Sequence, residues 1–136
     1  MKKLFVCLFA LLSLACSVDE DIQPSAVMLL PVESAIVPDE FVIGEEYEIF
    51  ITYIRPTACH VFKDIYSKLE SDGYLIAIMS NVFNESNDCP PNTETVETSF
   101  MFKPTRDINT YVFKFWHGSN GNSEDDYIIF EVPVVD

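Results

Sequence analysis

Residues 106–116 read Arg-Asp-Ile-Asn-Thr-Tyr-Val-Phe-Lys-Phe-Trp, and this stretch decides the fold. The aromatic residues Tyr111, Phe113 and Phe115 lie two positions apart, which is the period of a β-strand with one buried face. Polar residues, among them Asp107, stand directly before this alternation. The stretch therefore predicts a polar corner that leads into a strand of the hydrophobic core.

The same residues resemble the tyrosine corner of immunoglobulin-like domains, in which Asp-x-Gly-x-Tyr-x-Cys opens a central strand. Asp107 and Tyr111 hold matching positions, while Asn109 replaces the Gly and Phe113 replaces the Cys. Asn tolerates the left-handed backbone almost as Gly does, so the first change is mild. The second removes the inter-sheet disulfide of antibody domains and leaves the sandwich. The resemblance implies a structural corner in which the Tyr111 hydroxyl bonds to backbone upstream.

Alternating or apolar segments, separated by turn residues, follow one another along the chain. We expect strands over residues 27–32 with an extension at 35–37, and over 47–54, 59–66, 74–82, 95–102, 111–116 and 127–134. The segment 59–66 also fits a helical face, but the turn Ser71-Asp72-Gly73 leads directly into the next strand and favours a strand. With the corner, this spacing predicts an all-β fold: an immunoglobulin-like antiparallel β-sandwich of seven or eight strands, in one domain over 27–136.

Single residues predict where some of these strands lie. Pro31 stands inside the first apolar run, and a proline within a strand indicates a sheet edge. Arg55-Pro56 is expected to end the second strand. The segment 74–82 is apolar on both sides, so we expect it to be central. In the last strand, Ile128, Phe130, Val132 and Val134 are expected to face the core.

The composition excludes several classes of protein. The chain has 136 residues, of which 49% are hydrophobic and 13% aromatic, so it is long and apolar enough for a real core and is not a disordered protein. Its formal net charge is −14. Such a surface repels phosphate backbones, which argues against nucleic acid as a partner.

The N-terminus predicts a leader. Residues 1–15 combine a basic start, an apolar run over 4–12 and small residues at the end, as in a secretory signal peptide. Residues 12–16, Leu-Ser-Leu-Ala-Cys, resemble the lipobox of bacterial lipoproteins, in which the cysteine, here Cys16, becomes the acylated first residue of the mature chain. Residues 13–15 also fit the ordinary signal peptidase, so both cleavage routes remain open.

The number of cysteines favours the lipoprotein. The chain has four, and Cys7 is lost with the leader. A free thiol at Cys16 would leave three in an oxidising compartment, one of them unpaired. A lipidated Cys16 leaves Cys59 and Cys89, which we expect to form a disulfide.

Residues 16–26 predict an acidic tether between the lipid and the domain. The run Asp-Glu-Asp at 19–21 is similar to the surface-export signal that follows the cysteine in many Bacteroidota lipoproteins. Ser17, in place of Asp, is compatible with sorting to the outer membrane. The resemblance implies a protein held in the outer membrane by its N-terminal lipid, and the export signal implies the cell surface.

Few residues suggest chemistry, and we expect no catalytic residue and no cofactor. The motifs of hydrolases, metalloproteases and nucleotide-binding proteins do not occur in the sequence. A metal site shared by His60 and His117 would need further ligands with matched spacing. The loop 117–126 holds oxygen ligands of the kind that Ca²⁺ prefers, but the same residues form hairpin turns, and we favour the turn over a calcium site. The oxygen-bearing candidates are Asn120, Asn122, Glu124, Asp125 and Asp126.

Three aromatic residues outside the predicted core pattern have a functional alternative. Tyr66, Trp116 and Tyr127 offer a flat aromatic surface for a sugar or another protein, although aromatics in sandwiches more often pack in the core. The function we expect is a non-catalytic binding or accessory module whose partner is an unknown protein or glycan. The alternatives are a small envelope hydrolase working through carboxylates, and a structural spacer or inhibitor.

Overall fold

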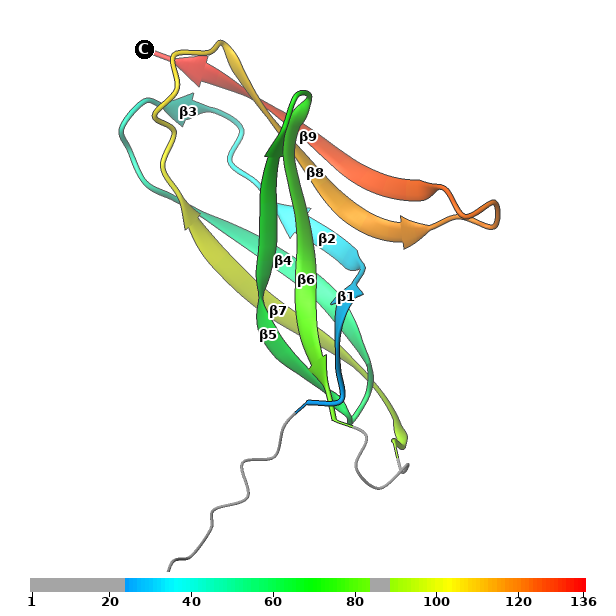
Figure 1. The fold of residues 1–136 in the computed structure, drawn as a ribbon. Helices are drawn as coiled ribbons and strands as arrows, with labels where there is room; N and C mark the ends of the chain where they lie inside the picture. The colour runs from blue at the N-terminus through cyan, green and yellow to red at the C-terminus, as the bar shows by residue number, and fades with distance from the viewer. Residues whose placement is uncertain (1–23, 84–88) are drawn as a thin grey trace, which may run out of the picture.

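The computed structural model describes residues 24–83 and 89–136. Over these residues the chain is all β, without a helix, and its strands form two sheets that pack together (Figure 1). The predicted leader, Cys16 and most of the predicted tether lie outside the described residues. The described strands are β1 (Ala26–Leu30), β2 (Val32–Ile36), β3 (Phe41–Val42), β4 (Tyr47–Thr57), β5 (His60–Glu70), β6 (Gly73–Val82), β7 (Pro91–Phe102), β8 (Thr110–Ser119) and β9 (Asp125–Val135).

The larger sheet has six strands and the smaller sheet has three. The smaller sheet has the order β2-β4-β7, and the larger has the order β1-β6-β8-β9-β3, with β5 also paired to β6. As predicted, β6 is central, because β5 pairs with one of its edges along its whole length and β1 and β8 pair with the other. The sandwich is therefore present, with nine strands in the described residues instead of seven or eight.

The prediction that all strands pair antiparallel is wrong at two places. β8 runs parallel to β6 over Tyr74–Ile76, and β3 runs parallel to β9. The reason at β8 is the path of the chain: β7 belongs to the smaller sheet, so the chain must cross between the sheets at the corner before β8 begins. It then enters the larger sheet in the direction of β6. The two residues of β3 were not expected from the sequence at all.

Pro31 marks a change of sheet. The predicted strand over 27–32 is in fact two strands, because β1 pairs in the larger sheet and β2 pairs in the smaller one. Proline has no backbone N–H to donate, so a break in the ladder costs least at this residue. On the other side of the break, His117 Nδ1 lies 2.6 Å from the carbonyl oxygen of Val32. This contact fastens β8 to the chain where it leaves the larger sheet.

Other boundaries differ from the prediction by a few residues. Arg55-Pro56 does not end β4, which continues to Thr57 across a register shift between Arg55 and Thr57. The ambiguous segment 59–66 is a strand, as favoured, and β5 extends it to Glu70. The strand β7 begins at Pro91, before the start of the strand expected over 95–102, and residues 84–88 lie outside the described part.

The core lies between the two sheets and is rich in aromatic rings. Phe41, on the short strand β3, contacts four of these rings, with centroid distances from 4.8 Å to Tyr47 to 6.0 Å to Phe113. The even positions of β9 contact this core, as the alternation predicted. The largest buried core side chains are Tyr53, Tyr111, Phe41, Phe113, Phe115, Ile49, Ile51, Ile76 and Ile78.

The Tyr111 hydroxyl makes the backbone contact that the corner implies. It accepts a hydrogen bond from the backbone nitrogen of Arg106 at 2.8 Å and donates one to the carbonyl oxygen of the same residue at 3.1 Å. The ring itself is 1% exposed and packs against Phe102 and Tyr74. Asp107 is exposed, so the corner depends on Arg106 and Tyr111.

The disulfide joins Cys59 and Cys89, with an S–S distance of 2.09 Å and a separation of 30 residues. It lies between β4–β5 and the start of β7, where Phe83 N also bonds to the Cys59 carbonyl at 2.9 Å. Closing a loop of this length stabilises a domain by roughly 3 to 4 kcal/mol in the chain-entropy account. The bond therefore ties the smaller sheet to β5 and β6 at one end of the sandwich.

We predict that Tyr111→Phe lowers the free energy of unfolding by about 0.5 to 1.5 kcal/mol, because it removes the hydroxyl that satisfies two groups of the Arg106 backbone. Urea unfolding followed by fluorescence measures the change. Tyr66→Phe is the matched control, since Tyr66 lies on the outer face of the larger sheet. Equal stability of Tyr111→Phe and the wild type would contradict the role assigned to the corner.

Candidate functional site

The outer face of the larger sheet carries a groove where β1 and β8 diverge along β6. β8 pairs with β6 up to Ile76, and β1 pairs with it from Ile78 onward. Both strands meet the same edge, so a groove of about 180 Å³ forms around Ala77 between them. We call it the aromatic groove, and it is lined by Leu29, Tyr66, Leu75, Ala77, Trp116, Asp125 and Tyr127.

Three of these lining residues are the aromatics that the sequence singled out as a possible surface. Trp116 and Tyr127 are direct cross-strand partners on β8 and β9, while Tyr66 lies opposite Ala77 on β5. Each of the three is half-buried, and together they cover Ala77, which is only 1% exposed. The structure thus brings together residues that are 61 positions apart at the extremes, from Tyr66 to Tyr127.

A carboxylate, Asp125, lines the aromatic groove together with the rings. Asp125 Oδ1 accepts hydrogen bonds from Trp116 Nε1 at 3.0 Å and from Ser119 Oγ at 3.1 Å. The bond to the indole fixes the orientation of the tryptophan ring. Burial, together with the Asp125 carboxylate, raises the pKa of Tyr127, so this phenol stays neutral over the physiological range. The groove therefore presents rings, two phenols and one negative charge.

Lys114 lies beside the groove, and its positive charge is paired with two carboxylates. Its ammonium lies 2.8 Å from Asp72 and 2.9 Å from Glu70, and 5.3 Å from the centroid of the Tyr127 ring. Hydrogen bonds to Asp72 and Glu70 raise the pKa of Lys114, and the same bonds lower the pKa of both carboxyls. Lys68 also lies 3.6 Å from Glu70, so two carboxylates and two ammonium groups meet in this cluster and their formal charges balance.

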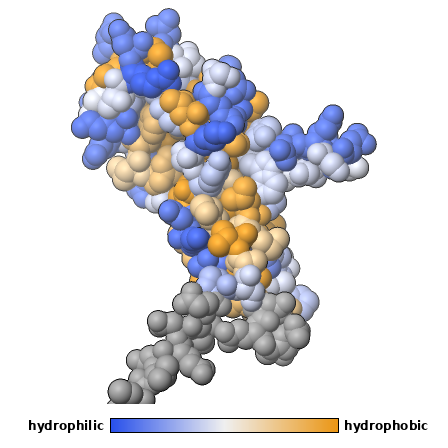
Figure 2. Space-filling view, viewed as in Figure 1, coloured by the Kyte–Doolittle hydropathy of each residue, from blue (hydrophilic) through white to orange (hydrophobic). Residues whose placement is uncertain are grey.

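Figure 2 shows how hydrophobic and hydrophilic side chains are distributed over one face of the molecule. Hydrophobic side chains are visible along the elongated body, while the tip of the β8–β9 hairpin projects from it as a hydrophilic arm. Exposed apolar residues next to the groove include Val27 and Leu29 on β1 and Ile129 on β9, which are 47%, 42% and 58% exposed. An apolar surface of this kind on an acidic protein is a feature of binding sites.

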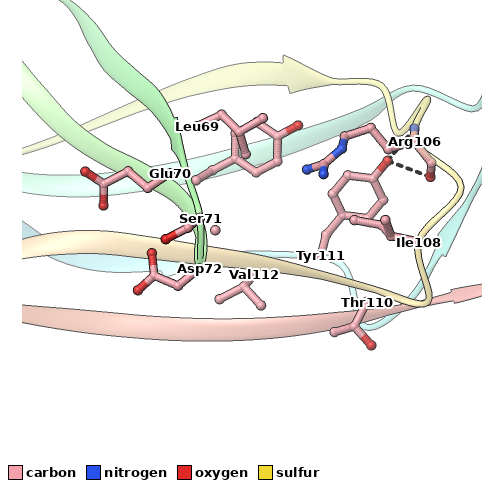
Figure 3. Close-up of a pocket in the computed structure, with 11 residues that line it drawn as sticks. Leu69, Glu70, Ser71, Asp72, Arg106, Ile108, Thr110, Tyr111 and Val112 are labelled. Atoms are coloured by element: carbon pink, nitrogen blue, oxygen red, sulfur yellow. Dashed lines mark hydrogen bonds between the residues drawn. The ribbon is translucent and has the colours of Figure 1, made fainter.

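A second hollow, of about 220 Å³, lies at the tyrosine corner. It is formed by the β5–β6 turn and the loop before β8 (Figure 3). Figure 3 shows the Arg106 guanidinium directed into the hollow, while the carboxylates of Glu70 and Asp72 point away from it. The hollow thus contains one cationic group, that of Arg106. The Tyr111 hydroxyl is already hydrogen-bonded to the backbone. We interpret it as part of the corner, because Arg106 and Tyr111, which line it, are the two residues joined by the corner's hydrogen bonds.

The calcium candidate is organised as a hairpin turn. Asn120 Oδ1 accepts hydrogen bonds from the backbone nitrogens of Asn122 and Glu124, and Asn120 Nδ2 donates to Glu124 Oε2. Asp125 is turned toward Trp116, and Asp126 Oδ1 accepts from the nitrogen of Tyr127. The side chains are therefore engaged in closing the loop, which is the interpretation that the sequence favoured.

The two histidines are not brought together. His60 Nδ1 lies 2.8 Å from Thr57 Oγ1 at the start of β5, and His117 contacts Val32. The two histidines are separated by the length of β1. His60 lies level with Ala26 at the start of β1, since both pair with Val82, whereas Val32, the contact of His117, follows the far end of β1. In the part of the chain that the structure describes, no group of three or more His, Cys, Asp or Glu side chains is placed to hold a metal ion.

Compared with protein-family models, with curated proteins and with solved structures, the chain has no match. Among the described residues, no helix is long and apolar enough to cross a membrane.

We predict that Lys114→Met changes the acid dependence of stability. The carboxyls of Glu70 and Asp72 have lowered pKa values in the folded protein, so the stability they contribute is present above their ordinary pKa values and is lost as the pH falls through the lowered ones. The melting temperature of the wild type should exceed that of Lys114→Met at pH 7, and the gap should close below about pH 4.

Melting curves between pH 7 and acid measure this gap. Lys68→Met is the control, because Lys68 is 3.6 Å from Glu70 and its side chain is 60% exposed; such a pair contributes little. A gap between wild type and Lys114→Met that stays constant with pH would disprove the assignment.

Proposed function

We propose that the protein is a non-catalytic binding module, anchored in the outer membrane by a lipid on Cys16, and that it binds its partner in the aromatic groove. The observation that carries the binding role is the convergence of Tyr66, Trp116 and Tyr127 around one carboxylate, Asp125. Binding sites commonly combine apolar and aromatic walls with a few placed polar groups.

The position of these rings supports a binding role over a purely structural one. The core between the sheets has its own set of aromatic residues, and the groove residues lie on the opposite face of the larger sheet. Rings left in contact with water forgo part of the free energy of burial, at about 25 cal/mol per Å² of apolar surface. A partner that covers the groove recovers this free energy, whereas in a spacer domain without a partner the rings would stay exposed to water.

The alternative of a hydrolase that works through carboxylates has less support. A general acid of that kind needs a carboxyl whose pKa is raised by burial or by a second carboxylate. Among the described residues, every Asp and Glu is exposed except Glu70, which is half-buried. The Lys114 ammonium lowers the pKa of Glu70, which is the wrong direction for an acid catalyst.

The anchor is supported by the lipobox-like sequence before Cys16 and by the parity of the cysteines. With Cys59 and Cys89 paired, Cys16 is left as the lipidation residue of the mature chain. Several acyl chains give stable attachment, while one chain alone gives marginal attachment. The described domain begins at β1, and Figure 1 places this start at the end of the sandwich opposite the C-terminus.

We expect the intact mass of the membrane-extracted protein to start at Cys16 and to include acyl groups. Cys16→Ala should abolish both the added mass and the membrane association, because the thiol is the acceptor of the lipid. Mass spectrometry of the two proteins makes the comparison. An unacylated mature chain in the membrane fraction would refute the anchor and leave the binding role to be judged separately.

We also expect that a photoreactive phenylalanine analogue at position 29 captures a partner in intact cells, because Leu29 stands at the rim of the groove and is 42% exposed. The matched control is position 101, since Met101 is 60% exposed on the smaller sheet. Adducts are detected by gel shift and identified by mass, and Trp116→Ala should remove them. Equal capture at both positions, or none at position 29, would count against binding in the groove.

A further inference from the structure

We propose that the aromatic groove binds an alkylammonium group, the side chain of a lysine on a basic partner protein. This inference rests on the proposed binding role of the groove and adds the chemistry that it recognises. Three observations carry it: the apolar residues of the groove, its carboxylate and aromatic rings, and the negative net charge of the chain.

The floor of the groove matches the aliphatic part of a lysine. Leu29 on β1 and Leu75 on β6 provide only hydrocarbon surface, while Ala77 is buried beneath the rings. The volume of about 180 Å³ suits one extended side chain. Lysine buries its four methylene groups along apolar surface while its ammonium stays near polar groups. A groove that combines apolar residues with one carboxylate is the complement of that side chain.

The carboxylate and the aromatic rings of the groove suit the ammonium group of a lysine. Asp125 supplies a negative charge, and the faces of Trp116, Tyr127 and Tyr66 attract cations through their quadrupoles. Trp116 is held toward the carboxylate by its own hydrogen bond to Asp125, so ring and charge are oriented before a ligand arrives. Preorganisation of this kind reduces the entropy cost of binding.

The protein already uses one of these rings in this way. The Lys114 ammonium lies 5.3 Å from the centroid of Tyr127, within the range of a cation–π contact. Lys114 does not line the groove, and it is committed to Glu70 and Asp72. Lys68, the other lysine of this face, pairs with Glu70 at 3.6 Å. Among the described residues Asp125 forms no ion pair, so its charge is left for a partner.

Charge complementarity distinguishes a basic protein from a neutral glycan as the occupant. None of the groove-lining residues is basic, and the whole chain has a net charge of −14. Such a field attracts a basic partner and accelerates its association. A sugar ring needs several polar groups around its hydroxyls, whereas the groove offers two phenols and one carboxylate, of which one oxygen is already engaged by Trp116 and Ser119.

Trp116 is the only tryptophan of the chain, so its fluorescence reports on the groove directly. We would titrate the wild-type protein with the end-blocked peptide Gly-Lys-Gly, and with two analogues that carry Nε-acetyl-lysine or norleucine. Acetylation keeps the aliphatic part of the lysine side chain and removes its positive charge. Norleucine has a similar aliphatic side chain but no ammonium group. We expect saturable binding of the lysine peptide and binding about tenfold weaker for both analogues.

Two variants with the same change in charge locate the interaction. Asp125→Asn should weaken binding of the lysine peptide about tenfold, as expected for a loss of the paired charge. Asp126→Asn should leave it unchanged, because successive residues of a strand point to opposite faces. Calorimetric titration measures both, and melting curves check that each variant is folded. The comparison of peptides needs no variant, so it decides the proposal even where Asp125→Asn does not fold.

Several results would overturn the proposal. Equal affinity for the norleucine peptide would make the groove a purely apolar site, and equal weakening by Asp125→Asn and Asp126→Asn would reduce the effect to general charge attraction. Binding of neutral hexasaccharides in place of the lysine peptide would make the occupant a glycan. Each of these outcomes leaves the proposed binding role standing. Failure of all these ligands, together with no capture at position 29 in cells, would end both proposals.

Discussion

The free edge of β6 is shared by two strands, and the arrangement of the whole molecule depends on this division. β5 occupies the other edge of β6 along its entire length. β1 and β8 therefore pair with different parts of the free edge, β8 up to Ile76 and β1 from Ile78. The start of β6 also requires a glycine: Gly73 has a φ of +143°, and a Cβ there would lie 2.6 Å from the carbonyl oxygen of Val112. A side chain at this position would push β8 away from β6 at the only three residues where they pair.

The same division explains why the chain changes sheet where it does. β1 ends at Leu30 because the edge beyond Ile78 is approached by β8, and Pro31 then releases the chain from the ladder. Gly118 has a φ of +105°, which favours glycine, and a Cβ there would make an ordinary van der Waals contact with Pro31, 3.5 Å from its Cγ. The contact between His117 and Val32 closes the junction. The aromatic groove lies on the outer face next to this junction, and is thus a consequence of how two strands share one edge.

Much of the fold was predictable from local patterns, and most of the site was not. The period of two in residues 111–115 and in β9 identified the core faces, since alternation follows from strand geometry alone. The parallel pairing of β6 with β8 was missed because it depends on where the chain crosses between sheets, which no local pattern records. The short strand β3 was missed because Phe41-Val42 is too brief to show a period.

The groove illustrates the same limit. Tyr66, Trp116 and Tyr127 were recognised as a surface of interest, yet their meeting at Ala77 depends on three strand registers. Leu29 and Leu75 carried no signal, because apolar residues in strands usually belong to a core. Asp125 was grouped with the turn residues as a calcium candidate, whereas its carboxylate faces the indole of Trp116. The alternation of β9 would have placed it on the face of Tyr127, two residues away.

One strand carries both the fold and the candidate site, and this coupling limits how each can change. Along β8, Tyr111, Phe113 and Phe115 point into the core, while Lys114 and Trp116 point outward. A shift of register by one residue would exchange the two sets, placing a lysine in the core and the core rings in water. The tie from Tyr111 to the Arg106 backbone fixes that register at the start of the strand. The groove is therefore held in place by the same hydrogen bonds that hold the sandwich together.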